Sequence, residues 1–268
     1  MISQLEKTIT LRYLKPKKKD GFLNVISIFS FIGISLGVAV LIIVMSVMNG
    51  FRTELVNKIV GFNAHIVIKP YSNLINKKKL NNNTLKSLSN NLIFTNSGEG
   101  VLFNKEYTKG LVLRGYSKND FLKLNIIKKG NYEGNPKNLI DNGISIGKDL
   151  ALNYDLKIGD QILIMSPNGI QTIIGSIPKQ EPFIVTSIFD SGLSEFDQNI
   201  AFLNIKSLES LFDLKKSERN LEIYLNNPTN IESIKSIVQD IFEDEFVYTW
   251  ADMNSSLFSA LKIERNVM

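Results

Sequence analysis

The residue types that most often carry out catalysis or bind metals are scarce in this sequence. It contains no cysteine and a single histidine, His65, which excludes disulfides, thiolate metal sites and cysteine nucleophiles. Neither a P-loop nor an HExxH motif is present, and the GxSxG pattern occurs only as GISLG (33–37), inside a long apolar stretch, and as GISIG (143–147). His65 is expected to make a structural hydrogen bond, and Asp190, Glu195 and Asp197 are expected to be solvated loop residues. The sequence therefore predicts no catalytic residue, no metal site and a chain that is not an enzyme by itself.

One segment, Pro167–Pro178, has an unusual composition for a connection between strands. It joins two predicted strands, Gln161–Met165 and Phe183–Phe189, and holds four isoleucines among glycines and two prolines. Loops usually carry polar side chains instead. A long apolar connection of this kind either packs on the core or offers a surface to a partner, and the residues leave both readings open.

The net charge of +5 is concentrated near the N-terminus. Residues 1–20 hold six basic residues against two acidic ones, so the rest of the chain is nearly neutral. Such a distribution argues against binding to nucleic acid, which needs a basic surface on the folded domain. The spacing of Leu5 and Ile9 favours an amphipathic helix on a membrane surface, the alternative being a frayed basic tail.

An apolar stretch follows this basic segment. Residues 21–51 contain no charge, and fifteen of the twenty-four residues from Val25 to Met48 are Leu, Ile, Val or Phe. At about 1.5 Å per residue, this length crosses a hydrocarbon core of about 30 Å. The stretch is too long for a signal peptide and lacks a small-residue cleavage site, so we expect an uncleaved membrane helix. The basic flank predicts a cytoplasmic N-terminus with the following domain outside.

Within this helix, Gly33 and Gly37 form a GxxxG pair, which either marks a helix contact or arises by chance. After it, the pattern predicts two strand-helix-strand units, one within residues 64–116 and one within 221–250. Trp250, which ends the second unit, is expected to anchor the boundary between domain and membrane. We therefore expect an α+β domain with a β-rich insertion.

Several segments together resemble the lipoprotein-releasing ABC permeases of the LolC/LolE type. They are SLGVAVLIIVMSVMNGFRTELVNKIVGFNAHIVI (Ser35–Ile68), IGKDLALNYDLKIGDQILIMSP (Ile146–Pro167), GSIPKQ (Gly175–Gln180) and LFSALKIERNVM (Leu257–Met268). The resemblance implies a MacB-like periplasmic core domain and a chain that leads into a second membrane helix beyond Met268. Its implied domains are residues 1–20 (cytoplasmic interfacial segment), 21–50 (first membrane helix), 51–250 (core domain, insertion about 104–220) and 251–268 (return segment).

The resemblance also implies a function, in which the chain is a permease subunit in the bacterial inner membrane. Such a subunit forms a homodimer or heterodimer with a second permease subunit above cytoplasmic ABC ATPase subunits. The complex extracts lipoproteins from the outer leaflet and passes them to the periplasmic carrier LolA. ATP and Mg would bind the ATPase, leaving no cofactor in this chain. Relatives devoted to efflux or division signalling, and a sensor or adhesion module with a single anchor, are the alternatives.

Particular residues acquire roles by this resemblance. It places lipoprotein acyl chains against Val44, Val47, Met48 and Phe51 of the membrane helix. It makes Lys179 and Gln180 an adjoining pad, where the sequence departs from carrier-recruiting relatives by carrying Glu181 in place of a basic residue. The carrier-binding loop, called the hook, comprises Pro167, Asn168, Gly169, Ile170, Gln171, Thr172, Ile173, Ile174, Gly175, Ser176, Ile177 and Pro178.

Overall fold

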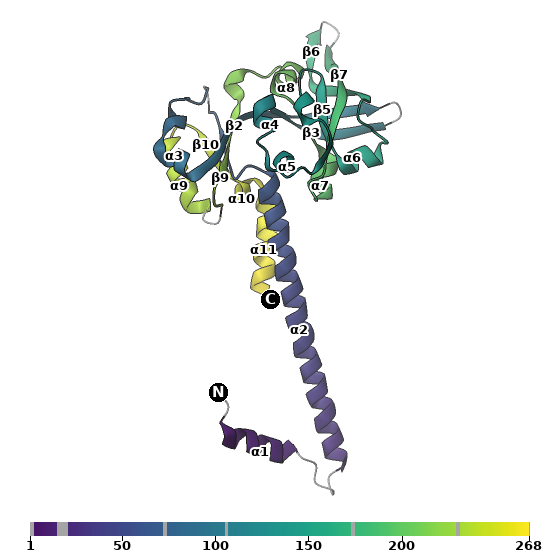
Figure 1. Ribbon diagram of the computed structural model, residues 1–268, viewed down its shortest axis with the longest axis vertical. Coiled ribbons are helices and arrows are strands. Elements are labelled where there is room, and N and C mark those ends of the chain that lie inside the picture. Colours follow the sequence, from purple (N-terminus) through teal and green to yellow (C-terminus); the bar gives the residue numbers. More distant parts are fainter. Residues whose placement is uncertain are drawn as a thin grey trace. The chain divides into compact units, whose positions relative to one another are not determined.

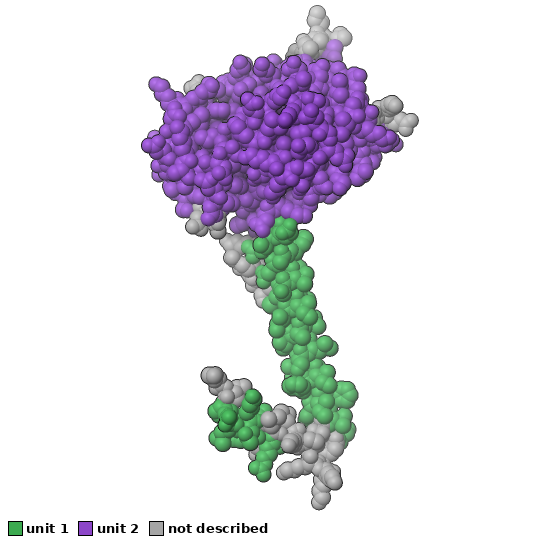
Figure 2. Space-filling view, in the orientation of Figure 1, with its two compact units in different colours: residues 1–54, 268 green, residues 55–267 purple. Residues whose placement is uncertain are grey.

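The computed structural model describes residues 3–14, 21–71, 74–104, 107–172, 175–228 and 231–267. The chain divides into two compact units, residues 1–54 with residue 268 and residues 55–267, coloured green and purple in Figure 2. Helix α2 (Gly21–Phe62) is continuous through the boundary between them, so its last two turns belong to the second unit.

The first unit consists of helical elements. Helix α1 (Gln4–Leu14) is capped by Ser3, whose hydroxyl accepts the Glu6 N–H at 3.2 Å while the Glu6 carboxylate accepts the Ser3 N–H at 2.8 Å. Within α2, residues 25–62 form a helix long and apolar enough to cross a membrane, and its apolar side chains from Val25 to Val47 are exposed. The helix continues past residue 50, as the spacing of Phe51, Leu55 and Ile59 predicts.

The second unit contains an antiparallel sheet. The predicted unit within residues 221–250 enters it whole, but the strands expected at 100–103 and 109–116 belong to the barrel, and a strand beginning at Ser89 takes their place in the sheet. Its strand order is β10-β1-β9-β2, and every pairing in it is antiparallel. The strands are β1 (Ile66–Lys69), the first half of β2 (Ser89–Asn104), β9 (Asn220–Leu225) and β10 (Phe246–Thr249). Alternation along β1 and β9 directs Ile66, Ile68, Leu221 and Ile223 to one face, where helices cover them.

The insertion forms a barrel that shares a strand with this sheet. Within the described residues, the order β2-β3-β8-β5-β7-β6 returns to β2, because β6 pairs with both β7 and β2. Strand β4 pairs with residues 187–189 of β7, on the edge opposite β5 and beyond the end of β6. Closure removes the free edges that an open sheet would expose. The remaining strands are β3 (Tyr107–Tyr116), β4 (Tyr132–Gly134), β5 (Gly143–Gly147), β6 (Gln161–Thr172), β7 (Gly175–Phe189) and β8 (Ile200–Asn204).

Short helices surround these sheets, as Figure 1 shows. Helices α3 and α9 pack on the antiparallel sheet through Leu85 and Val238, whereas α6 and α8 close the barrel core through Leu150 and Leu208. The helices are α3 (Asn83–Leu88), α4 (Lys118–Phe121), α5 (Asn125–Lys128), α6 (Lys148–Asn153), α7 (Ser194–Asn199), α8 (Ile205–Phe212), α9 (Ile231–Ile241), α10 (Trp250–Met253) and α11 (Ser255–Val267). Single turns of 3-10 helix are η1 (Lys79–Asn81), η2 (Pro136–Asn138) and η3 (Lys216–Glu218).

The predicted fold class is confirmed, but two residues differ from their predicted settings. Trp250 begins helix α10 and is 7% exposed within the core beside the antiparallel sheet, so its interpretation as a boundary anchor was wrong. Asp197 is 3% exposed and accepts the Ser191 N–H at 2.9 Å, so it is not a solvated loop residue. In both cases tertiary packing covers a residue that local sequence places at a surface.

Candidate functional site

Strands β6 and β7 form a long hairpin whose base is part of the barrel. Ile162 and Ile164 from β6 and Phe183 and Val185 from β7 are buried in the barrel core. β6 also pairs with β2 over residues 163–165. Beyond Met165 the described part of β6 pairs only with β7, and Figure 1 shows this end of the hairpin projecting from the domain.

The projecting end corresponds to the predicted connection 167–178, and its secondary structure differs from the prediction. Instead of an irregular loop, β6 continues to Thr172 and β7 begins at Gly175. The register moves from Ser166–Lys179 to Gly169–Pro178, so a bulge at residues 167–168 takes up the extra chain length. A bulge is where a strand tolerates proline, because the ladder hydrogen bonds are already interrupted there.

The described side chains of the hairpin tip expose apolar surface. Ile177 is 53% exposed, and both Pro167 and Pro178 are exposed. Ile173 and Ile174, which the resemblance includes in the hook, lie outside the described residues. Asn168 lies in the bulge, and the other predicted members form the paired backbone of the tip: Gly169, Ile170, Gln171, Thr172, Gly175 and Ser176.

The predicted pad residues lie at the foot of this projecting end. Lys179 Nζ lies 3.2 Å from the Glu181 carboxylate and donates to the Ser210 carbonyl oxygen at 2.5 Å, so helix α8 anchors β7 here. The amide of Gln180 donates to Met165 Sδ at 3.6 Å. Glu181 therefore partly neutralises the positive charge that Lys179 brings to this surface.

The predicted acyl-contact residues lie in the first unit. Val44, Val47 and Phe51 are 49%, 63% and 61% exposed, and Met48 is half-buried. A Cβ added to either glycine of the GxxxG pair would meet no other atom within 4 Å, so this face of the helix is open. Such a surface suits hydrocarbon or another helix far better than water.

Comparison with known protein families matches residues 27–241 to the MacB-like periplasmic core domain. The chain belongs to this family. It is 28% identical to the lipoprotein-releasing system transmembrane protein LolC of Neisseria meningitidis serogroup B, covering 98% of this chain and 65% of that protein. It is 30% identical to LolC of Buchnera aphidicola subsp. Acyrthosiphon pisum, covering 97% and 65%, and 27% identical to LolE of Haemophilus influenzae, covering 97% and 64%.

These matches confirm the resemblance to LolC and LolE. The chain spans about 65% of the length of the curated relatives it matches. Among solved structures, the periplasmic region of MacB from Actinobacillus actinomycetemcomitans aligns with 74% of this chain and 94% of its own length, at 10% identity and a TM-score of 0.41.

Several titratable groups of this MacB-like domain make hydrogen bonds or ion pairs within it. His65 is buried and accepts the Leu225 N–H on Nδ1 at 2.8 Å, as predicted, and burial lowers its pKa. Asp190 pairs with Lys148 at 2.9 Å, which holds the pKa of that carboxyl below its usual value. Burial raises the pKa of Asp197. Among the described residues, no group of acidic residues or histidine is arranged to hold a metal ion.

A buried polar cluster joins β9 and β3, and the sequence does not predict it. The Glu222 carboxylate of β9 accepts hydrogen bonds from the hydroxyls of Tyr116 at 3.0 Å and Tyr224 at 2.9 Å, and burial raises its pKa. Arg114 lies beside it and donates to Asn63 Oδ1 at 2.8 Å. The sequence could indicate only Tyr224, which lies two residues after Glu222 in the same strand. Tyr116 belongs to β3, and only the tertiary fold brings it to Glu222.

Proposed function

We propose that this chain forms part of the membrane subunit of an ATP-driven transporter that releases lipoproteins from the bacterial inner membrane. The observation that carries the proposal is similarity along nearly the whole chain to proteins named as LolC and LolE of the lipoprotein-releasing system. In this proposal the N-terminus is cytoplasmic and the MacB-like domain is periplasmic. The chain pairs with a second permease subunit, and ATP and Mg bind separate ATPase subunits.

The apolar helix supplies the surface that such a substrate requires. Each methylene moved out of hydrocarbon costs about 0.8 kcal/mol, so acyl chains must leave the bilayer along a covered apolar path and with an energy source. The exposed side chains of Val44, Val47 and Phe51, with half-buried Met48, are suited to contact these chains. We assign the acyl contacts to this end of the helix.

The hairpin tip is suited to recruit a periplasmic carrier. It extends beyond the barrel, so a partner can approach both faces, and it presents Ile177 and two prolines instead of the polar residues usual at a loop tip. We propose that residues 167–178 bind the lipoprotein carrier LolA, with Lys179 and Gln180 beside the contact. Because Lys179 pairs with Glu181, apolar contact at the tip provides most of the binding in this proposal.

Photo-crosslinking in the assembled complex tests this assignment. A benzoylphenylalanine at Ile177 or Ile174 is expected to crosslink the carrier, whereas the same group at Leu152, which is 70% exposed on helix α6, is expected not to. Equal adducts at both places, or none at the hairpin in a complex that releases lipoproteins, would reject the assignment.

A hairpin deletion separates this function from related ones. Replacing residues 167–178 by Asn-Gly joins Ser166 to Lys179, which already face each other in the ladder, through a favourable two-residue turn. Lipoproteins should then accumulate in the inner membrane. Normal release would favour a MacB-like permease with another task.

A further inference from the structure

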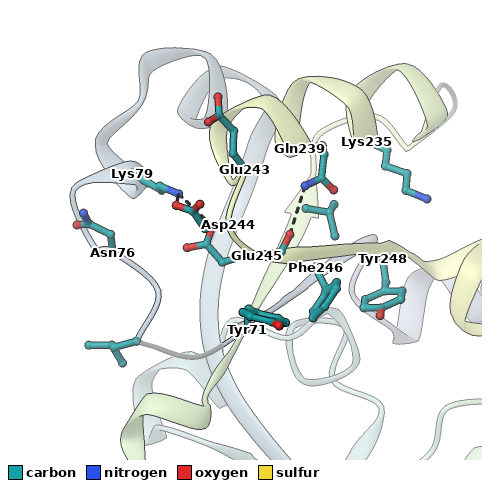
Figure 3. Close-up of a pocket in the computed structure, with 12 residues that line it drawn as sticks. Tyr71, Asn76, Lys79, Lys235, Gln239, Glu243, Asp244, Glu245, Phe246 and Tyr248 are labelled. Atoms are coloured by element: carbon teal, nitrogen blue, oxygen red, sulfur yellow. Dashed lines mark hydrogen bonds and ion pairs between the residues drawn. The ribbon is translucent and has the colours of Figure 1, made fainter.

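A groove of about 900 Å³ runs along the outer edge of strand β10 (Figure 3). None of the residues that line it belongs to the hairpin of β6 and β7. One wall is formed by Lys235 and Gln239 of helix α9, which lie one helical turn apart. The other side carries Tyr71, from the segment after β1. Residues from both faces of β10, Val247 and Tyr248 among them, line the groove, so it follows the edge of the strand.

The backbone of β10 leaves one residue open toward this groove. Among the described strands, β10 pairs only with β1. Trp250 N donates to His65 O, and in an antiparallel pair every second residue bonds to the neighbouring strand. The next residues of β10 that bond to β1 are therefore Tyr248 and Phe246. The backbone groups of Glu245, Val247 and Thr249 therefore face outward.

The two neighbours of Val247 are already engaged. The Thr249 N–H donates to Asp252 at 2.8 Å, and the Glu245 carbonyl oxygen accepts from Gln239 at 3.3 Å. No residue in the described part of the chain bonds to the N–H and C=O of Val247 across this edge. A residue of an added antiparallel strand that lies opposite Val247 can form two backbone hydrogen bonds with it, one to its N–H and one to its C=O.

The side chains around this edge define what an added strand must carry. On one face Tyr71, Phe246 and Tyr248 form an exposed aromatic row, with ring centroids 5.5 Å and 6.4 Å apart in succession. Apolar side chains at alternate positions of an added strand would cover these rings. The α9 wall, with Gln239 and Lys235, is polar.

Charge is distributed unevenly along the groove. Lys79 pairs with Glu245 at 3.0 Å and Lys235 with Asp252 at 2.8 Å, so both cations have partners. Glu243 is exposed, and the Asp244 side chain is 92% exposed although it lies 3.9 Å from Lys79. The end of the groove next to the start of β10 is therefore acidic.

We propose that this groove binds an extended polypeptide segment as an added antiparallel strand along β10. The segment alternates apolar and polar residues and carries basic residues at its C-terminal end, which antiparallel pairing places beside Glu243 and Asp244. This partner site goes beyond lipoprotein release and does not rest on it. Its test contains no lipid, so its failure would leave the proposed transport function untouched.

The probe is a fluorescein-labelled peptide, Thr-Val-Thr-Val-Thr-Val-Lys-Lys, titrated with the full chain in detergent micelles and followed by fluorescence anisotropy. Saturable binding is expected. The same peptide with N-methylated threonine amides should not bind, because the threonine opposite Val247 must donate a backbone hydrogen bond. Equal binding of the methylated peptide would overturn the proposal.

Two pairs of variants test the walls. Reversing both acids (Glu243→Lys with Asp244→Lys) should weaken the probe at least about fivefold and favour a peptide ending in Glu-Glu. The matched control is Glu133→Lys, an exposed residue of β4. Tyr71→Ser should weaken binding at least about threefold, whereas Leu152→Ser, at similar exposure, should not.

A further experiment tests whether the groove is occupied by a second copy of this chain instead of a partner segment. The chain has no cysteine, so a mixture of Phe246→Cys and Tyr248→Cys variants can form disulfide-linked dimers only through these positions, which face each other when Val247 of one copy pairs with Val247 of another. Dimers that the probe peptide does not suppress would mean that β10 pairs with itself and would overturn the proposal. Loss of dimers on adding the peptide, or no dimers at all, agrees with a partner segment.

Discussion

Substitution Glu222→Ala removes the acceptor of two buried hydroxyls, and we expect it to destabilise the domain strongly. Tyr116 and Tyr224 both donate to this carboxylate, and all three residues are buried. A buried hydroxyl left without a partner costs about 1–3 kcal/mol, so the two together lower the free energy of unfolding by about 2–6 kcal/mol. Glu222→Gln keeps a carbonyl acceptor in the same place and should change it by less than about 1 kcal/mol at neutral pH.

The pH dependence of the same variants gives a second measure. Because burial raises the pKa of Glu222, the folded chain holds this proton at a pH at which the unfolded chain has released it. The folded state then binds more protons, so this residue makes stability fall as pH rises from about 4.5 toward the raised pKa, and stay level above it. Glu222→Gln should lack this component of the slope.

Urea unfolding followed by the fluorescence of Trp250, the single tryptophan, measures both effects. Trp250 lies in the core beside the antiparallel sheet that contains β9, so its emission reports on this region. A loss below about 1 kcal/mol in Glu222→Ala would show that the tyrosine hydroxyls find other partners. An unchanged pH slope in Glu222→Gln would show that the carboxylate titrates normally. Either result would refute the reasoning.

Three further predictions concern stability and are measured by thermal or urea unfolding. Arg219→Ala leaves the Glu209 carboxylate, 8% exposed and held at 2.5 and 2.7 Å by the guanidinium, without its cation and should cost about 3–5 kcal/mol; a loss under about 1 kcal/mol would contradict this. Gly147→Ala places a Cβ 2.2 Å from the Asp197 carbonyl oxygen and should cost about 3 kcal/mol or more, whereas near-neutral behaviour would mean that helix α7 moves freely. The Asn-Gly replacement of residues 167–178 should change stability by less than about 1 kcal/mol, because Pro167, Ile177 and Pro178, the tip residues whose side chains are described, are exposed; a large loss would show that the tip packs on the domain.

Much of the fold follows from local sequence patterns. The uncharged run after residue 20 predicts helix α2, and the apolar stripe ending at Ile241 predicts α9, because both depend on periodicity within one element. The role of His65 was also predictable, since a lone histidine entering a buried strand needs a hydrogen-bond partner. These features are independent of what the rest of the chain does.

The features that local sequence could not predict depend on distant partners. Closure of the barrel rests on pairing of β2 with β6, which are about sixty residues apart in the chain. The hairpin tip was interpreted as a loop because glycine and proline usually end strands, and a bulge that accommodates Pro167 has no clear local signal. Glu222 lies in an alternating strand that resembles a half-exposed one, but the barrel covers its second face.

Two buried acids of the domain, Glu209 and Glu222, lie where the barrel meets the antiparallel sheet. Glu209 of α8 accepts hydrogen bonds from Asn96, where β2 passes from the sheet into the barrel, and from Arg219, just before β9. Glu222 of the sheet binds Tyr116 of barrel strand β3. Because a hydrogen-bonded carboxylate needs its donors in fixed positions, these contacts set the barrel's position on the sheet more specifically than apolar packing does. The hairpin projects from the barrel and the groove lies at the edge of the sheet. These contacts therefore fix the position of the hairpin relative to the groove.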